Sequence, residues 1–148
     1  MGFLDKLKSA VSSITGGGAK VFVTAENPSR TTPFTVKVKA VVADHELKIS
    51  RAYVRLIGLE EVYIPNVRVE NSTQNIRENT NTFERDFNIA LEQTLNPNQE
   101  YEWEAQVEFP ADAQPTFRGR YATHTLRILA GLDTPGNDPD SGWIVLDV

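Results

Sequence analysis

Apolar and polar residues alternate along most of the chain from residue 19 onward, which is typical of β-strands with one buried and one solvated face. The clearest alternation runs from Glu100 to Phe109, and a second runs from Tyr121 to Leu132. Pro110 and Pro115 lie between them. Because proline has no amide hydrogen to give to a strand ladder, the pattern predicts two long strands joined by a proline-bounded turn.

Shorter alternations predict further strands around this pair. They cover Lys20–Glu26, Phe34–Val42, Arg51–Leu59, Phe83–Ile89 and Gly142–Val148. A run at Val62–Val69 is interpreted as an edge strand or an irregular crossing, because Pro65 interrupts it. Seven or eight short strands, with turn residues about every 8–12 positions, predict an all-β fold, an antiparallel immunoglobulin-like or arrestin-like β-sandwich.

Two stretches depart from this period. Asn71–Asn81 contains a single large apolar residue and is expected to be a solvated loop. Met1–Thr15 follows the helical period, and its apolar residues fall on one stripe, namely Phe3, Leu4, Leu7, Val11 and Ile14. Gly16 to Gly18 supply the positive φ that favours a helix end. We therefore expect a short amphipathic helix and glycine linker over residues 1–18, and a single sandwich domain over residues 19–148.

The segment between the two long strands resembles a known family. From Trp103 to Tyr121 it resembles the signature of arrestin-like domains, in which a strand ends at a proline and a Pro-[Ser/Thr]-[Phe/Tyr]-x-Gly turn starts the next strand. The matching residues are Pro110, Pro115, Thr116, Phe117 and Gly119. The segment is similar to the bacterial sporulation-control, Spo0M-like branch, and Ile49–Glu60 resembles another strand of the family. Arrestin-like folds host cargo adaptors and receptor binders, so the resemblance implies the fold more than the function.

The resemblance also implies a structural role for the turn. Gly119 is expected at a positive φ where a Cβ is poorly tolerated, with Phe117 tucked under the end of the sandwich. The predicted core consists of inward-facing residues of the strongest strands. These are Trp103, Val107, Phe109, Phe117, Tyr121, Val36, Val38, Val54 and Leu56.

The composition excludes several classes of function. The chain has no cysteine, which rules out disulfides, thiolate metal sites and thiol catalysis, and fits a reducing compartment. Its net charge is −5 and its basic residues are scattered, so no nucleic-acid-binding face is expected. Charged residues interrupt the apolar stretch of Met1–Thr15, which argues against a secretory signal. We expect a cytoplasmic protein, with peripheral membrane contact as an alternative.

No convergent catalytic set is visible in the sequence. His45 and His124 are the only histidines, and neither has the spacing of a metal ligand or of a general base. Four carboxylates between Glu100 and Glu108 are expected to form a solvated outer face. The aspartate-rich Asp133–Gly142 has glycine where the third ligand of a calcium loop belongs, so a hairpin loop is favoured over a cation site. We expect no catalytic residue, cofactor or metal.

The sequence therefore predicts a non-enzymatic interaction or adaptor module with a protein partner. The apolar stripe of Met1–Thr15 is the candidate interaction surface, for a partner protein or a membrane surface. Docking of this helix on its own sandwich is the alternative. Two other functions stay open: a structural subunit that forms homo-oligomers through edge strands or the helix, and a cation-binding domain.

Overall fold

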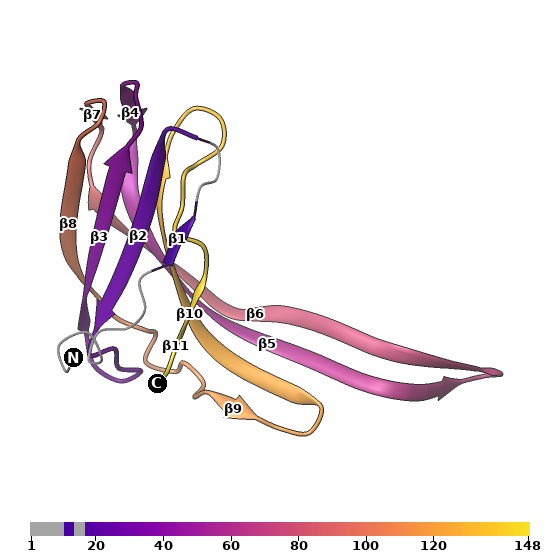
Figure 1. Cartoon of the computed structure of the whole chain (residues 1–148). Helices are drawn as coiled ribbons and strands as arrows, with labels where there is room; N and C mark the ends of the chain where they lie inside the picture. Colours follow the sequence, from indigo (N-terminus) through magenta and orange to yellow (C-terminus); the bar gives the residue numbers. More distant parts are fainter. Residues whose placement is uncertain (1–10, 14–16) are drawn as a thin grey trace, which may run out of the picture.

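The computed structural model describes residues 11–13 and 17–148. Within this part the chain forms eleven β-strands (Figure 1). They are β1 (Val11–Ser13), β2 (Ala19–Glu26), β3 (Phe34–Val42), β4 (Leu47–Ile49), β5 (Arg51–Val69), β6 (Ser72–Ala90), β7 (Gln93–Leu95), β8 (Glu100–Val107), β9 (Phe117–Arg118), β10 (Ala122–Asp133) and β11 (Ile144–Leu146).

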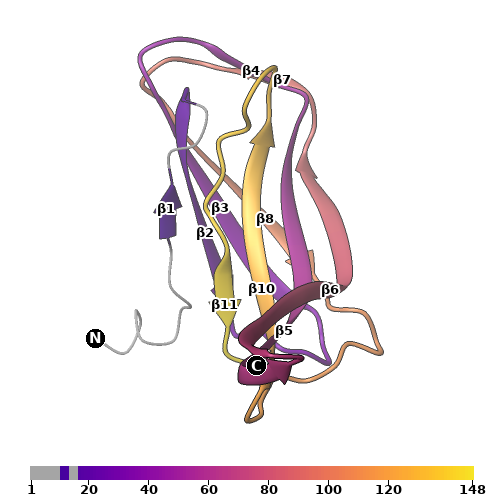
Figure 2. The same cartoon turned by 90° about the vertical axis from the view of Figure 1, so that its right-hand side faces the viewer.

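Two larger sheets face each other as a sandwich (Figures 1 and 2). The first sheet has the strand order β1-β2-β3-β8, and the second has the order β11-β10-β5-β6, with β9 beside β10. The pairs within both sheets are antiparallel, as is the small sheet of β4 and β7. The predicted all-β antiparallel sandwich is confirmed.

The period of two decides which side chains enter the core. In β3 every second residue from Phe34 to Val42 is buried, while Lys37 and Lys39 point outward. The buried set draws on both sheets. Its members include Val21, Val23, Val36, Val38, Val54, Leu56, Leu126, Ile128, Leu132 and Leu146. Burial of each such side chain contributes about 1.5–3 kcal/mol, so the facing apolar sides of the two sheets stabilise the fold.

The N-terminal helix prediction is wrong where the structure describes this segment. Val11–Ser13 forms strand β1, which pairs antiparallel with Val21–Val23 of β2. One β-branched valine and two serines are weak helix formers, and the edge of β2 offers their backbone groups hydrogen-bond partners. The rest of the predicted helix lies outside the described residues. Within those residues there is no helix long and apolar enough to cross a membrane.

The predicted solvated loop at Asn71–Asn81 is also wrong, because most of it lies in β6. Strands β5 and β6 pair almost from end to end and form one long hairpin, which extends well beyond the sandwich (Figure 1). Both faces of β6 are exposed between Ser72 and Asn81, apart from a partly buried Ile76. With neither face covered, the strand has no apolar alternation to reveal it.

Pro65 interrupts the pairing without ending β5. It lies at a register shift between Ile64 and Val67, where Asn66 has a φ of 58°. The ladder between β5 and β10 stops at Val62, so β5 is an edge strand at the proline. An edge tolerates proline because the missing amide hydrogen costs no ladder bond there. The edge-strand interpretation of this segment is therefore confirmed.

Most of the predicted core is buried, but the two aromatic residues around the turn are not. Trp103 is partly buried and packs against the core. Phe117 and Tyr121 are 39% and 42% exposed. Phe117 lies in the two-residue strand β9, where its ring stacks on His124 with the ring centroids 6.2 Å apart. The ring of Tyr121 lies under the guanidinium of Arg120 instead of in the core.

The turn glycine is constrained in a different way from the one expected. Gly119 does not have a positive φ. A Cβ at this position would lie 3.2 Å from the carbonyl oxygen of Ala122, whose contact with the Gly119 amide at 2.7 Å closes the turn. The space for a side chain is therefore limited by the backbone contact and not by the dihedral angle.

A pair of substitutions in one hairpin tests the assignment of faces. Leu126→Ala empties a fully buried site and is expected to lower the free energy of unfolding by about 2–5 kcal/mol. Val145→Ala, at a side chain that is 47% exposed, is expected to change it by less than about 0.5 kcal/mol. Urea unfolding followed by far-UV circular dichroism measures both. Similar losses for the two variants would contradict the assigned faces.

Candidate functional site

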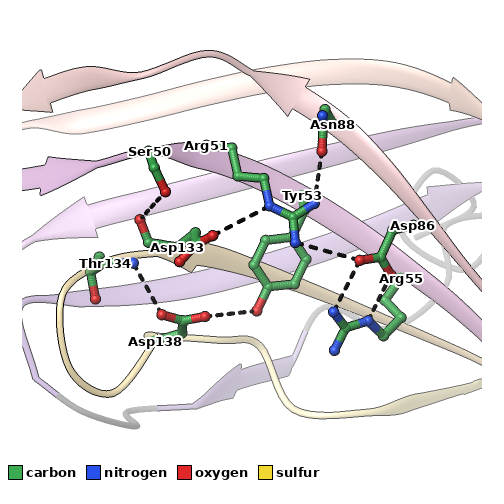
Figure 3. A network of polar contacts seen from close by, with 9 residues as sticks. All are labelled: Ser50, Arg51, Tyr53, Arg55, Asp86, Asn88, Asp133, Thr134 and Asp138. Carbon is green, nitrogen blue, oxygen red and sulfur yellow. Dashed lines mark hydrogen bonds and ion pairs between the residues drawn. The ribbon is translucent and has the colours of Figure 1, made fainter.

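Ion-paired side chains gather on the outer face of β5 and β6, beside the loop that follows β10 (Figure 3). Arg55 donates from Nε and Nη2 to the two carboxylate oxygens of Asp86, at 2.7 and 3.0 Å. This two-bond geometry suits the planar guanidinium. The hydrogen bond from Arg55 lowers the pKa of Asp86, and Asp86 raises the pKa of Arg55. Both groups therefore stay charged over the physiological range.

Arg51 connects the same carboxylate to two other elements. Its Nη1 donates to the side-chain oxygen of Asn88 at 2.7 Å, and its Nη2 lies 3.4 Å from Asp86. Its Nε lies 3.5 Å from a carboxylate oxygen of Asp133, at the end of β10. One guanidinium thus joins β5, β6 and β10 on their solvent side (Figure 3).

Tyr53 lies beneath the two arginines and is 5% exposed. The guanidinium carbons of Arg51 and Arg55 are 4.5 and 5.2 Å from the centre of its ring, within cation–π range. The ring covers its cross-strand partner Gly131, where a Cβ would lie 2.4 Å from the tyrosine hydroxyl. Burial raises the pKa of Tyr53 to about 12, and its hydroxyl donates to Asp138 at 3.4 Å.

In the loop that follows β10, two aspartate carboxylates accept hydrogen bonds from backbone amides of the same loop. Asp138 accepts the amide of Thr134 at 3.0 Å, and Asp140 accepts the amide of Gly142 at 2.8 Å. Gly136 and Gly142 have φ values of 93° and 73°, which favour glycine. No group of three or more histidine, cysteine, aspartate or glutamate side chains that could hold a metal occurs in the described part of the chain. The loop has the hairpin geometry that Asp133–Gly142 predicts.

A second polar cluster surrounds His124, which is fully buried. Its Nδ1 lies 3.0 Å from the carbonyl oxygen of Pro115, and its Nε2 lies 2.8 Å from the hydroxyl of Thr82. A carbonyl oxygen only accepts, so Nδ1 donates to Pro115, while Nε2 shares the second hydrogen bond with the hydroxyl of Thr82. Both ring nitrogens are therefore occupied by structural contacts.

A bulge in β6 and a glycine in β5 make this arrangement possible. Between Gly58 and Leu59 the register of the β5–β6 ladder shifts, which leaves Thr82 as an extra residue in β6. Such a bulge turns a side chain to a new direction, and here the hydroxyl reaches the buried imidazole. A Cβ on Gly58 would lie 2.4 Å from the Thr82 hydroxyl and 2.9 Å from Nε2 of His124. Glycine at position 58 leaves the space that the hydrogen bond needs.

The other polar residues considered as candidate site residues do not come together in one site. His45 lies exposed in a turn, with Nδ1 3.2 Å from a carboxylate oxygen of Asp44. It shares no contact with His124, so the two histidines do not form a common site. The acidic run between Glu100 and Glu108 is exposed, as predicted for a solvated face, and Lys39 lies 3.4 Å from Glu100.

The predicted interaction residues of the N-terminal segment fall almost entirely outside the described residues. These are Phe3, Leu4, Leu7 and Ile14, and for Val11 only the backbone in β1 is described. Contact of this apolar stripe with a partner or a membrane surface stays a prediction.

The outer end of the β5–β6 hairpin, residues 63–77, which we call the arm, is not predicted by the sequence pattern (Figure 1). Cross-strand pairing places Ile64 opposite Ile76, and Val67 and Val69 follow on the same face. This face continues the inner face of β5, but the first sheet does not extend over it (Figure 1). The alternation of Val62 and Ile64 is the sequence signal for a strand here. Pro65 interrupts this alternation, so the pattern does not show that the strand continues to Val69.

Raising the pH tests the burial of Tyr53. Its pKa is raised from 10.0 to about 12, so the folded protein retains this proton in a range where the unfolded chain loses it. The corresponding stability is present below pH 10 and is lost as the pH rises toward 12. Tyr53→Phe is expected to flatten the pH dependence of the free energy of unfolding between these values. Equal slopes for the two proteins in denaturant titrations would contradict this expectation.

The two histidines are expected to respond differently to alanine. His124→Ala removes a fully buried side chain together with its hydrogen bonds to the carbonyl of Pro115 and the hydroxyl of Thr82, and each of these bonds contributes about 0.5–1.5 kcal/mol. His45→Ala, at an exposed turn, is expected to stay within about 0.5 kcal/mol of the parent. Thermal unfolding of both variants measures the difference, and a His124→Ala protein as stable as the His45→Ala control would refute the structural role.

Comparison with known proteins bears on the fold. No family model and no curated protein matches the sequence. Among solved structures, the chain is similar to Spo0M, a sporulation control protein from Bacillus subtilis, with a TM-score of 0.61 and 17% identity. The match covers 88% of this chain and 49% of that one, so this chain spans about half the length of Spo0M. The chain therefore has the arrestin-like β-sandwich fold of Spo0M, as its Trp103–Tyr121 segment predicts.

Proposed function

We propose that the chain is a cytoplasmic, non-enzymatic interaction module of arrestin-like fold, and that the arm contacts a partner protein. The observation that carries the proposal is the uncovered apolar face of the arm. Val69 is 40% exposed, and Ile64, Val67 and Ile76 are partly exposed on the same face. Apolar side chains gathered on a projecting element are typical of interaction surfaces.

The backbone of the arm supports the same function. Beyond Tyr63, whose amide donates to the carbonyl of Tyr121 at 2.8 Å, β5 pairs only with β6 in the described part of the chain, and β6 is the last strand of its sheet. Both long edges of the arm therefore present backbone amides and carbonyls that another strand can pair with. An isolated two-stranded ribbon is only marginally stable in water. Contact with a partner would therefore stabilise the arm.

Two further observations support a function other than catalysis. Both ring nitrogens of the buried His124 are engaged by Pro115 and Thr82, which leaves neither available as a general base. The guanidiniums of Arg51 and Arg55 are directed at the carboxylate of Asp86. These polar groups hold strands and loops together, a role that suits a rigid scaffold for an interacting element.

Photo-crosslinking in the native cells tests the proposal. A benzoylphenylalanine at Val67 or Val69 is expected to give a discrete crosslinked product, because these side chains would lie in the contact. The same group at Leu91, which is 80% exposed and outside the arm, is the matched control and is expected to give none. Mass spectrometry of the product distinguishes a second copy of the chain from a different protein.

The proposal fails if neither arm position yields a product, or if Leu91 yields the same products as the arm. Circular dichroism of each labelled protein shows that the fold is retained. The result is therefore independent of any loss of structure.

A further inference from the structure

Strand β8 ends the first sheet and leaves one edge of its backbone open. It pairs with β3 along one side, and no described strand pairs with its other side (Figure 1). The amide of Val42 donates to the carbonyl of Gln99 at 2.9 Å, which makes this pair the hydrogen-bonded kind. Hydrogen-bonded pairs alternate along an antiparallel ladder, so the next ones are Ala40 with Tyr101 and Val38 with Trp103.

The residues between these pairs therefore direct their backbone groups to the open edge. They are Glu100, Glu102, Glu104 and Gln106. The ladder with β3 runs without a register shift, and β8 contains neither proline nor glycine. Natural edge strands are commonly protected from pairing by proline, bulges, shortness or charge, and of these β8 has only charge. Eight residues of regular strand are thus available for pairing.

The charge on the outer face of β8 is acidic and only partly compensated. Lys37 faces Glu104 in the register, but its ammonium lies 2.8 Å from a carboxylate oxygen of Glu26. Lys39 faces Glu102 but lies 3.4 Å from Glu100. Within the described residues, Glu102 and Glu104 therefore have no ion pair, although both are exposed beside the open edge.

The inner face of the same strand is aromatic and partly open. The rings of Tyr101 and Trp103 stack with centroids 6.1 Å apart, and both are only partly buried. Phe87 and Ile89 of β6, also partly buried, pack against the same core from the facing sheet. An added strand would place alternate side chains on this apolar side and the others on the acidic side.

We propose that the open edge of β8 binds an extended peptide segment in which basic residues alternate with apolar ones. The backbone of the segment pairs with Glu102 and Glu104, its lysines or arginines lie against their carboxylates, and its apolar residues cover Trp103. The carboxylates on the acidic side repel acidic segments and attract basic ones, and this charge selection gives the edge its specificity. This surface is separate from the arm, so the inference goes beyond the proposed function and does not depend on it.

The test uses the full chain and a fluorescein-labelled peptide of alternating lysine and valine, as long as β8 at eight residues. Fluorescence anisotropy is expected to show saturable binding. The double substitution Glu102→Lys, Glu104→Lys is expected to raise the Kd at least about tenfold, because two attractions become repulsions. Glu46→Lys with Glu92→Lys changes the net charge equally at exposed sites outside β8, and is expected to leave the Kd within about twofold.

Amide hydrogen exchange provides the second measurement. Binding of the peptide is expected to slow exchange at Glu102 and Glu104, because their amides then donate to the added strand. A peptide N-methylated at alternate residues loses the backbone groups that pair with them and is expected not to bind. The proposal is overturned if the lysine–valine peptide does not bind, if both double variants weaken it equally, or if it binds without protecting these amides.

Discussion

The buried imidazole of His124 joins three parts of the chain that are remote in sequence. Its two nitrogens contact the turn at Pro115 and the bulged Thr82 of β6, and it lies against Gly58 of β5. A buried ring with both nitrogens hydrogen-bonded is costly to separate from its partners, since each group left unpaired costs about 1–3 kcal/mol. The turn that carries the arrestin resemblance is therefore fastened to the strands at the point where the arm leaves the sandwich.

The bulge at Thr82 also shapes the arm. A bulge bends its strand and increases its twist, and two further register shifts, near Ala52 and near Ile64, act on the same hairpin. The β5–β6 ribbon can thus curve away from the sandwich without breaking its ladder (Figure 1). At the other end of β5, Tyr53 and its arginines hold the loop after β10 against the sheet (Figure 3). Exposed ion pairs contribute about 0–1 kcal/mol each, so the burial of Tyr53 stabilises this end more than the charges do.

The sandwich thereby carries two open surfaces of different chemistry. The arm presents an apolar stripe that includes Val67 and Val69, whereas the edge of β8 presents the carboxylates of Glu102 and Glu104. An apolar surface selects partners by shape and burial, and an acidic strand edge selects them by charge and backbone pairing. The two proposed binding surfaces would therefore select different classes of partner.

The alternation of residues by itself determined the strands that have one face in the core. Phe34–Val42 matches β3 residue for residue, and the inward face of β8 follows from the same period. In β10 and β11 the period separates two faces but does not show which one is buried. Tertiary structure decided the rest. Residues 72–81 form a strand because β5 supplies their hydrogen bonds. Neither face of this strand segment is covered, so its sequence shows no apolar alternation. The hydrogen bond between His124 and Thr82 depends on the bulge in β6. Such a contact between residues distant in sequence leaves no local pattern from which it could be predicted.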